Sequence, residues 1–231
     1  SPDSPHLYDL EVRSTDDTVR SYFGLRTIAV EQGRILLNGR PIFLHGPLDQ
    51  GYWPDGLYTA PTDDALRFDV EAAKRLGFDM IRKHVKVESD RWYFWADKLG
   101  LLVRQDMPSG DRFIVPGQPD VERTPESAAQ FELELGRMID GRRNHPSIVD
   151  WVVFNEGWGQ FDTARLTEVA KRRDPSRLVT AASGWNDRRT GDVVDYHTYP
   201  DPAALDCPEP ERASVLGEFG GLGLAVEGHT W

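Results

Sequence analysis

The chain has 231 residues, of which 39% are hydrophobic and 10% aromatic, enough for one large domain with its own core. Acidic residues outnumber basic ones by 38 to 27, and the formal net charge of -11 argues against nucleic acid or an anionic membrane as the main partner. The single cysteine, Cys207, excludes an intramolecular disulfide and a thiolate metal cluster, and no apolar run is long enough to span a membrane. Neutral substrates remain compatible with this composition.

Strand-like and helix-like segments follow one another along the chain. Residues 7–30 alternate polar and apolar positions around the turn sequence STDDT, which predicts an antiparallel strand pair. After Gly33, seven short apolar runs predict strands: PIFLHG, FDMIRKH, LLVRQD, SIVDWVVFNE, LVTAAS, VVDYHTY and ASVLGEF. Helices are predicted over about 62–76, through RWYFWADKLG, from Thr124 with Pro125 at the first position, and around Leu166.

Apolar strands separated by helices indicate parallel strands buried on both faces, in either a doubly wound sheet or a (β/α)₈ barrel. Nearly every predicted strand ends in polar or ionisable residues: His45, Arg82 with His84, Asp106, Asn155 with Glu156, Ser183, His197 with Tyr199, and Glu218. A barrel enzyme presents such a ring at its catalytic face, whereas an open sheet needs polar residues only at its switch point. We therefore predict an α/β fold of the TIM (β/α)₈ barrel type with seven visible strands.

The two ends of the sequence predict an excised piece of a longer protein. The closing stretch GLGLAVEGHTW supplies no eighth strand, and a barrel of seven strands leaves a sheet edge exposed. We expect residues 1–30 to be the remnant of a preceding domain and residues 31–231 to be a barrel incomplete at its C-terminus. The open edge favours homo-oligomer formation, and we expect the piece by itself to be inactive or nearly so.

Glu156 ends the fourth predicted strand and Glu218 ends the seventh. At the mouth of a barrel these two carboxylates can face each other, and glycoside hydrolysis requires such a pair, one to protonate the leaving oxygen and one to act at the anomeric carbon. Carboxyl groups about 5 Å apart give retention of configuration, and a separation of about 6.5–9.5 Å gives inversion. Each glutamate taken singly can equally cap a helix or pair with an arginine.

Three stretches of the sequence resemble glycoside hydrolase family 2, which includes β-galactosidases, β-glucuronidases and β-mannosidases. FGLRTIAVEQGRILLNGRPIFLHG is similar to the junction between the immunoglobulin-like domain and the barrel of that family, GRRNHPSIVDWVVFNE to its acid/base signature, and VLGEFGG to its nucleophile strand. The resemblance implies that residues 1–30 come from an immunoglobulin-like β-sandwich. It also implies that Glu156 is the general acid/base, that Asn155 binds the 2-hydroxyl of the sugar, and that Glu218 is the nucleophile.

The resemblance further implies that Arg82 contacts the nucleophile and that Tyr199 hydrogen-bonds to it. A cation and a phenol next to Glu218 favour its ionised form, and the pKa of Glu156, facing another carboxylate, is expected to be raised. Each of the two has a plainer alternative, since Arg82 can be a structural ion-pair partner and Tyr199 can pack before Pro200.

Four further residues are candidates for substrate binding. His197 and Trp185 either line the sugar pocket or belong to its wall. Asp49, in the aromatic-rich loop GPLDQGYWPDGLY, is a candidate acceptor for a sugar hydroxyl. Aligned on the arginine of IRKH, His84 stands where many members of the family have a serine, so its role is expected to differ.

The leading functional hypothesis is a retaining exo-β-glycosidase of the β-galactosidase type that uses two glutamates in a double displacement on terminal β-linked sugars. The alternatives are a catalytically inactive carbohydrate-binding barrel and a β-glucuronidase or β-mannosidase specificity. The magnesium ligands of some β-galactosidases are not matched around Asp106, so no metal and no cofactor is predicted.

Overall fold

The computed structural model describes residues 1–203 and 209–228, so Cys207 lies outside the described residues. Within these ranges, seven parallel strands run in chain order around the molecule. Five form one sheet: β6 (Leu48–Asp49), β7 (Met80–Lys83), β8 (Leu102–Asp106), β9 (Ile148–Asn155) and β10 (Leu178–Ser183). β11 (Val193–His197) lies beside β10 and pairs with β12 (Ala213–Glu218). This is the wall of a TIM-type barrel, and six of the seven predicted strands, from FDMIRKH to ASVLGEF, coincide with strands β7 to β12.

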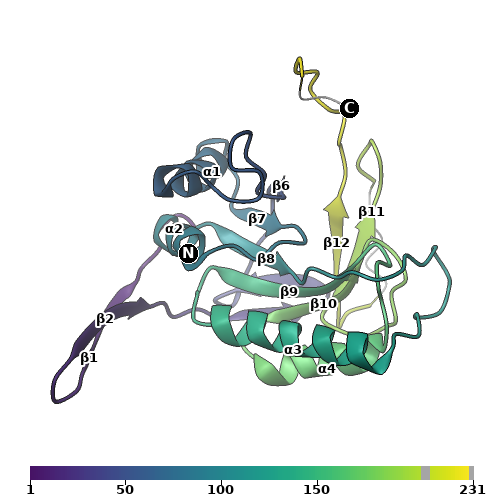
Figure 1. The fold of residues 1–231 in the computed structure, drawn as a ribbon, viewed down its shortest axis with the longest axis horizontal. Coiled ribbons are helices and arrows are strands. Elements are labelled where there is room, and N and C mark those ends of the chain that lie inside the picture. Colours follow the sequence, from purple (N-terminus) through teal and green to yellow (C-terminus); the bar gives the residue numbers. More distant parts are fainter. Residues whose placement is uncertain (204–208, 229–231) are drawn as a thin grey trace.

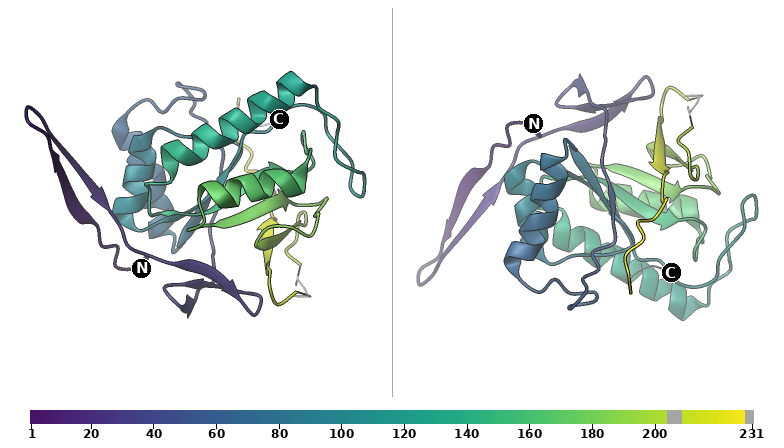
Figure 2. Two further views of the ribbon diagram at one scale, coloured as in Figure 1. Left: turned by 90° about the horizontal axis from the view of Figure 1, so that it is seen from below. Right: turned by 90° about the horizontal axis from the view of Figure 1, so that it is seen from above.

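Helices cover the outer face of this wall (Figures 1 and 2). They are α1 (Asp63–Arg75), α2 (Asp90–Leu99), α3 (Pro125–Arg142) and α4 (Thr163–Arg173). The predicted helix starts are confirmed at α1 and α3, where the hydroxyls of Thr62 and Thr124 accept hydrogen bonds from backbone N–H groups of the first turn. The described residues between β10 and β11 form no helix, so the strand–helix alternation is confirmed only as far as β10.

The predicted position of the first barrel strand is wrong. PIFLHG predicts a strand over residues 41–46, but the ladder with β7 is formed later, by Leu48 and Asp49. Before it, the carbonyl of His45 accepts from the backbone N–H groups of Asp79 and Met80 without forming a regular strand. Hydrophobicity marks this segment as buried, but the ladder itself depends on where the chain meets β7.

A short antiparallel sheet closes the end of the barrel where the strands begin. It consists of β3 (Ile28–Glu31), β4 (Arg34–Leu37) and β5 (Arg40–Pro41). Ile35 packs against the first residues of β10, β11 and β12, and Leu37 packs against Met80 and Leu102. This sheet therefore supplies the apolar floor of the barrel, and the polar residues lie at the other end.

The predicted strand pair near the N-terminus is confirmed as β1 (Tyr8–Arg13) and β2 (Thr18–Phe23). This hairpin projects from the barrel, and most of its side chains are exposed (Figures 1 and 2). The division into residues 1–30 and 31–231 falls at the end of β3, within the β3–β4 hairpin, and we keep it as a proposal about the origin of the segments.

A cavity of about 970 Å³ follows the gap between β6 and β12, where no further strand pairs with either edge among the described residues. It runs from Ile35 and Ile42 near the floor to Arg82 and Glu218 at the polar end. No helix within the described ranges is both long enough and apolar enough to cross a membrane.

Candidate active site

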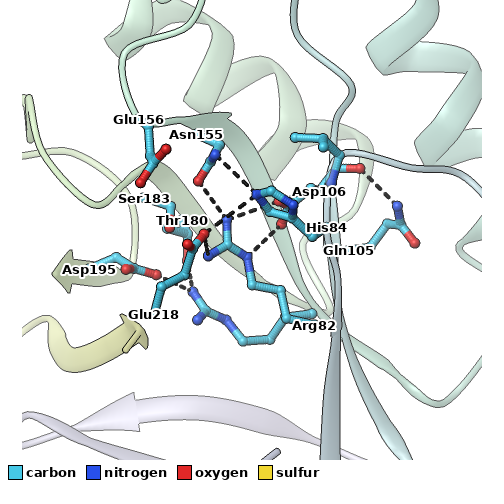
Figure 3. A network of polar contacts seen from close by, with 12 residues as sticks. Arg82, His84, Gln105, Asp106, Asn155, Glu156, Thr180, Ser183, Asp195 and Glu218 are labelled. Atoms are coloured by element: carbon cyan, nitrogen blue, oxygen red, sulfur yellow. Dashed lines mark hydrogen bonds and ion pairs between the residues drawn. The ribbon is translucent and has the colours of Figure 1, made fainter. Parts of the chain in front are cut away.

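Side chains from the carboxyl ends of the barrel strands meet around one buried guanidinium (Figure 3). Arg82, only 2% exposed, donates from Nε and Nη2 to the two carboxylate oxygens of Asp106 at 3.0 and 2.9 Å. Its Nη2 also donates to Oδ1 of Asn155 at 2.9 Å, and its Nη1 donates to Oε1 of Glu218 at 3.0 Å. The planar fork thus joins β7 to β8, β9 and β12. The expected contact between Arg82 and Glu218 is present.

Glu218, the last residue of β12, is buried and has both carboxylate oxygens occupied. Oε1 accepts from Arg82, and Oε2 accepts from the hydroxyl of Tyr199. Burial and the neighbouring carboxylate raise the pKa of Tyr199 above its ordinary value, so the phenol stays protonated and can donate. Both carboxylate oxygens of Glu218 are therefore oriented by donors, the guanidinium of Arg82 and the phenol of Tyr199.

Asn155 is oriented by its two neighbours. Because its Oδ1 accepts from Arg82, its Nδ2 is the donor in the 3.1 Å contact with Nε2 of His84. With Nε2 accepting, His84 carries its proton on Nδ1, and the Gln50 amide, whose Nε2 lies 3.0 Å from that nitrogen, must be turned by 180° to present its oxygen as the acceptor. Burial lowers the pKa of His84, so the ring is neutral. His84 thus belongs to the site as a neutral acceptor that fixes the Asn155 amide.

Glu156 follows directly after β9, in a left-handed backbone conformation with φ of 51°. That conformation costs a residue with a side chain about 1–2 kcal/mol. The N–H of Glu156 donates to the carbonyl of Ser183 on β10 at 2.9 Å. A carboxylate oxygen of Glu156 and one of Glu218 lie within 4.8 Å of each other. The structure brings the two predicted glutamates together at one end of the barrel.

His197, the last residue of β11, lies between the two glutamates. Its Nδ1 is 2.9 Å from Oε1 of Glu156, and its Nε2 is 2.8 Å from Oγ of Ser183 and 3.6 Å from Oε1 of Glu218. Burial alone would lower the pKa of His197, but the negative charge of Asp195 and the hydrogen bond to Glu156 outweigh it and raise the pKa to about 9. The ring is therefore a cation at neutral pH, and its Nδ1–H donates to Glu156.

This ion pair reverses one expectation. The sequence predicts a raised pKa for Glu156, because that residue faces Glu218. The hydrogen bond from His197 instead lowers the pKa of Glu156. The expectation is wrong because it counts the facing carboxylate and omits the cation between the two. In the protein without substrate, the proton of this pair lies on His197 and Glu156 is ionised.

A second charged layer lies deeper in the barrel, below the glutamates. Arg104 on β8 donates to Asp150 on β9 at 2.9 Å and to Asp195 on β11 at 2.7 Å, and all three are almost fully buried. Asp195 Oδ1 is also 3.5 Å from Nε2 of His197. Arg104 holds the pKa of Asp195 well below its usual range against the opposing effect of burial. The negative charge of Asp195 in turn stabilises the imidazolium of His197.

The remaining predicted site residues fall into two groups. The ring of Trp185 packs edge-on to His197, with centroids 6.0 Å apart, so it belongs to the wall beside the glutamates. Asp49 does not belong to the site around the two glutamates. It pairs with Lys83 on β7, and alternation along that strand directs Lys83 to the helix side while Arg82 faces the interior. The carboxylate of Asp49 thus binds the Lys83 ammonium outside the polar cluster.

Glu156, His197 and Glu218 each offer a ligand atom to a cation, and these atoms lie within 4.8 Å of one another. All three groups already have partners, since Arg82 and Tyr199 bind Glu218 and His197 donates to Glu156. Asp106, the acidic residue considered for a metal, is occupied by both ends of the Arg82 fork. The absence of a catalytic metal stays a prediction.

The model of the family described as glycosyl hydrolases family 2, TIM barrel domain, matches residues 28–207. The chain belongs to this family. The β-galactosidase of Vibrio cholerae is 25% identical to it over 95% of the chain and 23% of the relative's own length. The chain therefore spans about a quarter of that relative.

Solved structures of family 2 members are similar to the chain. Bacteroides uniformis β-glucuronidase 3 is 27% identical, with a TM-score of 0.68 over 85% of the chain and 26% of that protein. Bacteroides uniformis β-glucuronidase 2 is 22% identical, with a TM-score of 0.78 over 95% of the chain and 31% of that protein, which shows the fold alone. The barrel fold predicted from the sequence is confirmed.

The family 2 motifs predict functional residues at the strand ends, but they do not predict the buried charged residues that contact them. Asp195 is the clearest case, because it lies two positions before His197 on β11 and therefore faces the same side of the strand. That spacing was the signal available in the sequence. Arg104 and Asp150 carry no such signal, because their pairing depends on the register of β8 against β9, which shifts at a bulge between Val103 and Arg104.

Proposed function

We propose that residues 31–231 form the catalytic barrel of a retaining exo-β-glycosidase of the β-galactosidase type. The observation that carries this proposal is the approach of Glu156 and Glu218, whose nearest carboxylate oxygens are within 4.8 Å. Retaining glycosidases hold their carboxyl groups about 5–5.5 Å apart, whereas inverting enzymes need space for a water molecule between the acid and the sugar. The short separation supports a double displacement.

In the first step, Glu218 attacks the anomeric carbon, and the glycosidic carbon–oxygen bond breaks as the ester bond forms. The leaving oxygen takes a proton from Glu156. In the second step, Glu156 removes a proton from water, the water oxygen bonds to the anomeric carbon, and the ester bond to Glu218 breaks. Arg82 and Tyr199 donate hydrogen bonds to the two carboxylate oxygens of Glu218 and hold it in position for this attack.

The proton for the first step comes from the pair formed by His197 and Glu156. The imidazolium donates to Oε1 of Glu156 at 2.9 Å, so transfer to the carboxylate needs no rearrangement of heavy atoms. As the leaving oxygen approaches Glu156 and water is excluded, the proton passes from Nδ1 through the carboxyl group to that oxygen. His197 then accepts the proton back when Glu156 has deprotonated the water.

Two observations support a neutral galactoside as the substrate. The Vibrio cholerae relative is named a β-galactosidase. Within the described part of the chain, the cations next to the glutamates are Arg82 and His197, and carboxylates already neutralise both. A substrate carboxylate would find no unpaired positive charge on these two residues. The second candidate is a β-glucuronide, because Bacteroides uniformis β-glucuronidase 3 has a similar structure and is 27% identical.

The test uses the whole polypeptide that contains residues 1–231, incubated with a 2-deoxy-2-fluoro-β-galactosyl fluoride and digested for mass spectrometry. We expect a covalent adduct on Glu218, no adduct in Glu218→Gln, and unchanged labelling in Glu227→Gln, which alters an exposed glutamate of the same segment. Labelling only by the glucuronyl analogue would show that the substrate is a β-glucuronide and not a β-galactoside. Sugar binding without any adduct would indicate the inactive carbohydrate-binding barrel and overturn the proposal.

We further propose that the gap between β6 and β12 permits self-association of the 231-residue chain. Phe43, 83% exposed, and Leu48 line the cavity along this gap. Apolar side chains at an unpaired sheet edge favour contact with a second copy. A single monomer peak in sedimentation velocity at micromolar concentration would contradict this.

A further inference from the structure

Two aromatic side chains lie exposed close to the site and take no part in the reaction described above. Phe113, in the segment between β8 and α3, is 41% exposed, and Trp158, two residues after Glu156, is 47% exposed. Their ring centroids are 5.4 Å apart. Large aromatic rings left in contact with water next to a catalytic group indicate a binding surface.

The rings are continuous with the catalytic residues. Phe113 packs edge-on to Trp185 with centroids 6.4 Å apart, and Trp185 packs edge-on to His197 at 6.0 Å. His197 in turn donates to Glu156. The two exposed rings are therefore connected to Glu156 through Trp185 and the buried His197, and Trp158 follows Glu156 by two residues in the chain.

The backbone under these rings is fixed by a small ribbon. Phe113 and Trp158 form an antiparallel bridge, the N–H of Ile114 donates to the carbonyl of Gly157 at 3.2 Å, and the N–H of Gly159 donates to the carbonyl of Arg112 at 2.8 Å. Such a pairing holds the two side chains at a set distance, as a binding platform requires.

The two glycines of NEGWGQF make this approach of the chains possible. Gly157 and Gly159 have φ of 71° and 56°. A Cβ at Gly159 would lie 1.7 Å from the carbonyl oxygen of Gly110, and a Cβ at Gly157 would lie 2.5 Å from that of Ile114. Only glycine fits at these positions. The glycines on both sides of Trp158 thus serve the ribbon that presents its ring.

One buried cation holds this ribbon in place. The guanidinium of Arg123 donates to the carbonyl oxygens of Gly110 and Gly159 at 3.1 and 2.8 Å. It lies over the rings of Phe131 and Phe161, 4.8 and 4.5 Å from their centroids. Arg123 therefore ties the ribbon to the packed core behind it, and the exposed faces of Phe113 and Trp158 sit on a rigid base.

We propose that Phe113 and Trp158 form the binding site for a sugar ring on the leaving-group side, so that the preferred substrate is a β-linked disaccharide or oligosaccharide. The apolar C–H face of a pyranose packs well on aromatic rings, and its hydroxyl groups stay in water at the rim. The leaving group departs past the residue that protonates it, and the two rings are connected to that residue through Trp185 and His197. The inference rests on the proposed function and specifies which leaving groups that site accepts.

The test separates the leaving group from the chemistry. Fluoride is too small to reach the platform, so Trp158→Ala and Phe113→Ala should acquire the 2-fluorogalactosyl label on Glu218 within about twofold of the unsubstituted rate, which also shows that they fold. Their kcat/KM for a β-galactosyl disaccharide should fall about tenfold, the loss of one aromatic contact. Trp158→Phe should restore most of it, and Phe68→Ala, an exposed phenylalanine on α1, should change neither value.

Reactivation of the labelled protein tests sugar binding at the platform directly. Added glucose or cellobiose should accelerate release of the 2-fluorogalactosyl group from the unsubstituted protein, by accepting it, and should accelerate it several-fold less in Trp158→Ala. If labelling and disaccharide hydrolysis fall equally in Trp158→Ala, the rings support Glu156 and do not bind a sugar, which would overturn the proposal. Unchanged disaccharide kinetics would overturn it too. A missing label in the unsubstituted protein would instead show that the proposed function has failed, and the platform with it.

Discussion

Nδ1 of His197 lies 2.9 Å from Oε1 of Glu156, and the two side chains form an ion pair at the mouth of the barrel. The positive charge of His197 is itself stabilised by Asp195, which is buried against Arg104. A chain of four alternating charges thus runs from the barrel interior to the proposed acid. It decides which residue holds the catalytic proton in the absence of substrate.

His197→Gln should shift the pH dependence of the reaction. The pKa of His197 is raised to about 9, and the pair shares one proton, so the alkaline limb of kcat/KM should lie near pH 9 in the unsubstituted protein. Without the imidazolium, the proton is held by Glu156 alone, and the limb should fall below about pH 7. Because the folded pKa exceeds the ordinary value, the stabilisation from this pair is present below pH 6.5 and is lost as pH rises through about 9.

The measurement is a pH–rate profile of kcat/KM, with urea midpoints recorded at pH 6 and pH 10. Trp185→Phe is the matched control, because it alters the wall beside His197 without removing a titrating group. An alkaline limb that stays at the same pH in His197→Gln would show that another group holds the proton.

Glu156→Ala should discriminate between leaving groups. A substrate whose leaving group is a weak base, such as fluoride, needs no proton, so formation of the adduct on Glu218 should persist within about tenfold. Hydrolysis of a disaccharide should fall by about 10³-fold or more, because general acid assistance is lost. Added azide should react in place of activated water and give a β-glycosyl azide, the product of retention. An α-azide would contradict the double displacement.

Arg82→Lys should damage both stability and activity although the charge is kept. The fork of Arg82 satisfies Asp106, Asn155 and Glu218 at once, and a lysine supplies a single point donor. We expect a loss of about 3 kcal/mol in the free energy of unfolding, since buried carboxylates lose partners, and a fall of about 10²-fold or more in kcat. Arg165→Lys on the outer face of α4, where the pairs are partly exposed, should change little. Equal effects of the two substitutions, measured by urea unfolding and initial rates, would contradict the role of Arg82 as a hub.

Asp69→Asn should stabilise the fold at neutral pH. Burial raises the pKa of Asp69 to about 6, helped by the nearby Asp49 and opposed by Lys83. The folded state thus favours the neutral acid, and stability is lost as pH rises from about 4 to about 6. Because the side chain is partly exposed, we expect a gain of about 1 kcal/mol at pH 7 and none at pH 4. Asp64→Asn, in the exposed first turn of α1, should give no gain. A gain from Asp69→Asn that is equal at both pH values would show that charge is not the cause.

Periodicity and capping residues made much of the fold predictable. The helix starts at Thr62 and Thr124 follow from local hydrogen bonding, and the apolar runs of β7 to β12 follow from burial on both faces. The first strand could not be located in this way, because the apolar residues of PIFLHG are explained by packing and not by strand pairing. Ile42 and Leu44 pack on the floor of the barrel, and the ladder with β7 starts only at Leu48.

The same limit applies to the site. The polar strand ends bring Glu156, Asn155, Arg82 and Glu218 within reach of a sequence argument, because the carboxyl ends of parallel strands share one face of the barrel. Asp49 also ends a strand, but its register opposite Lys83 directs it away from that face. Alternation along a strand can be predicted only when the first paired residue is known.

The sequence by itself determined the barrel class, the family signatures and the two glutamates, because these depend on local pattern and on the order of the strands. Tertiary structure decided the protonation of Glu156, since the charges of His197, Asp195 and Arg104 come from strands far apart in the chain and act on one another through a water-poor interior. It also placed Phe113 beside Trp158, where two separate loops meet in one ribbon. Electrostatic and packing relationships of this kind depend on distances in space, which the linear sequence does not contain.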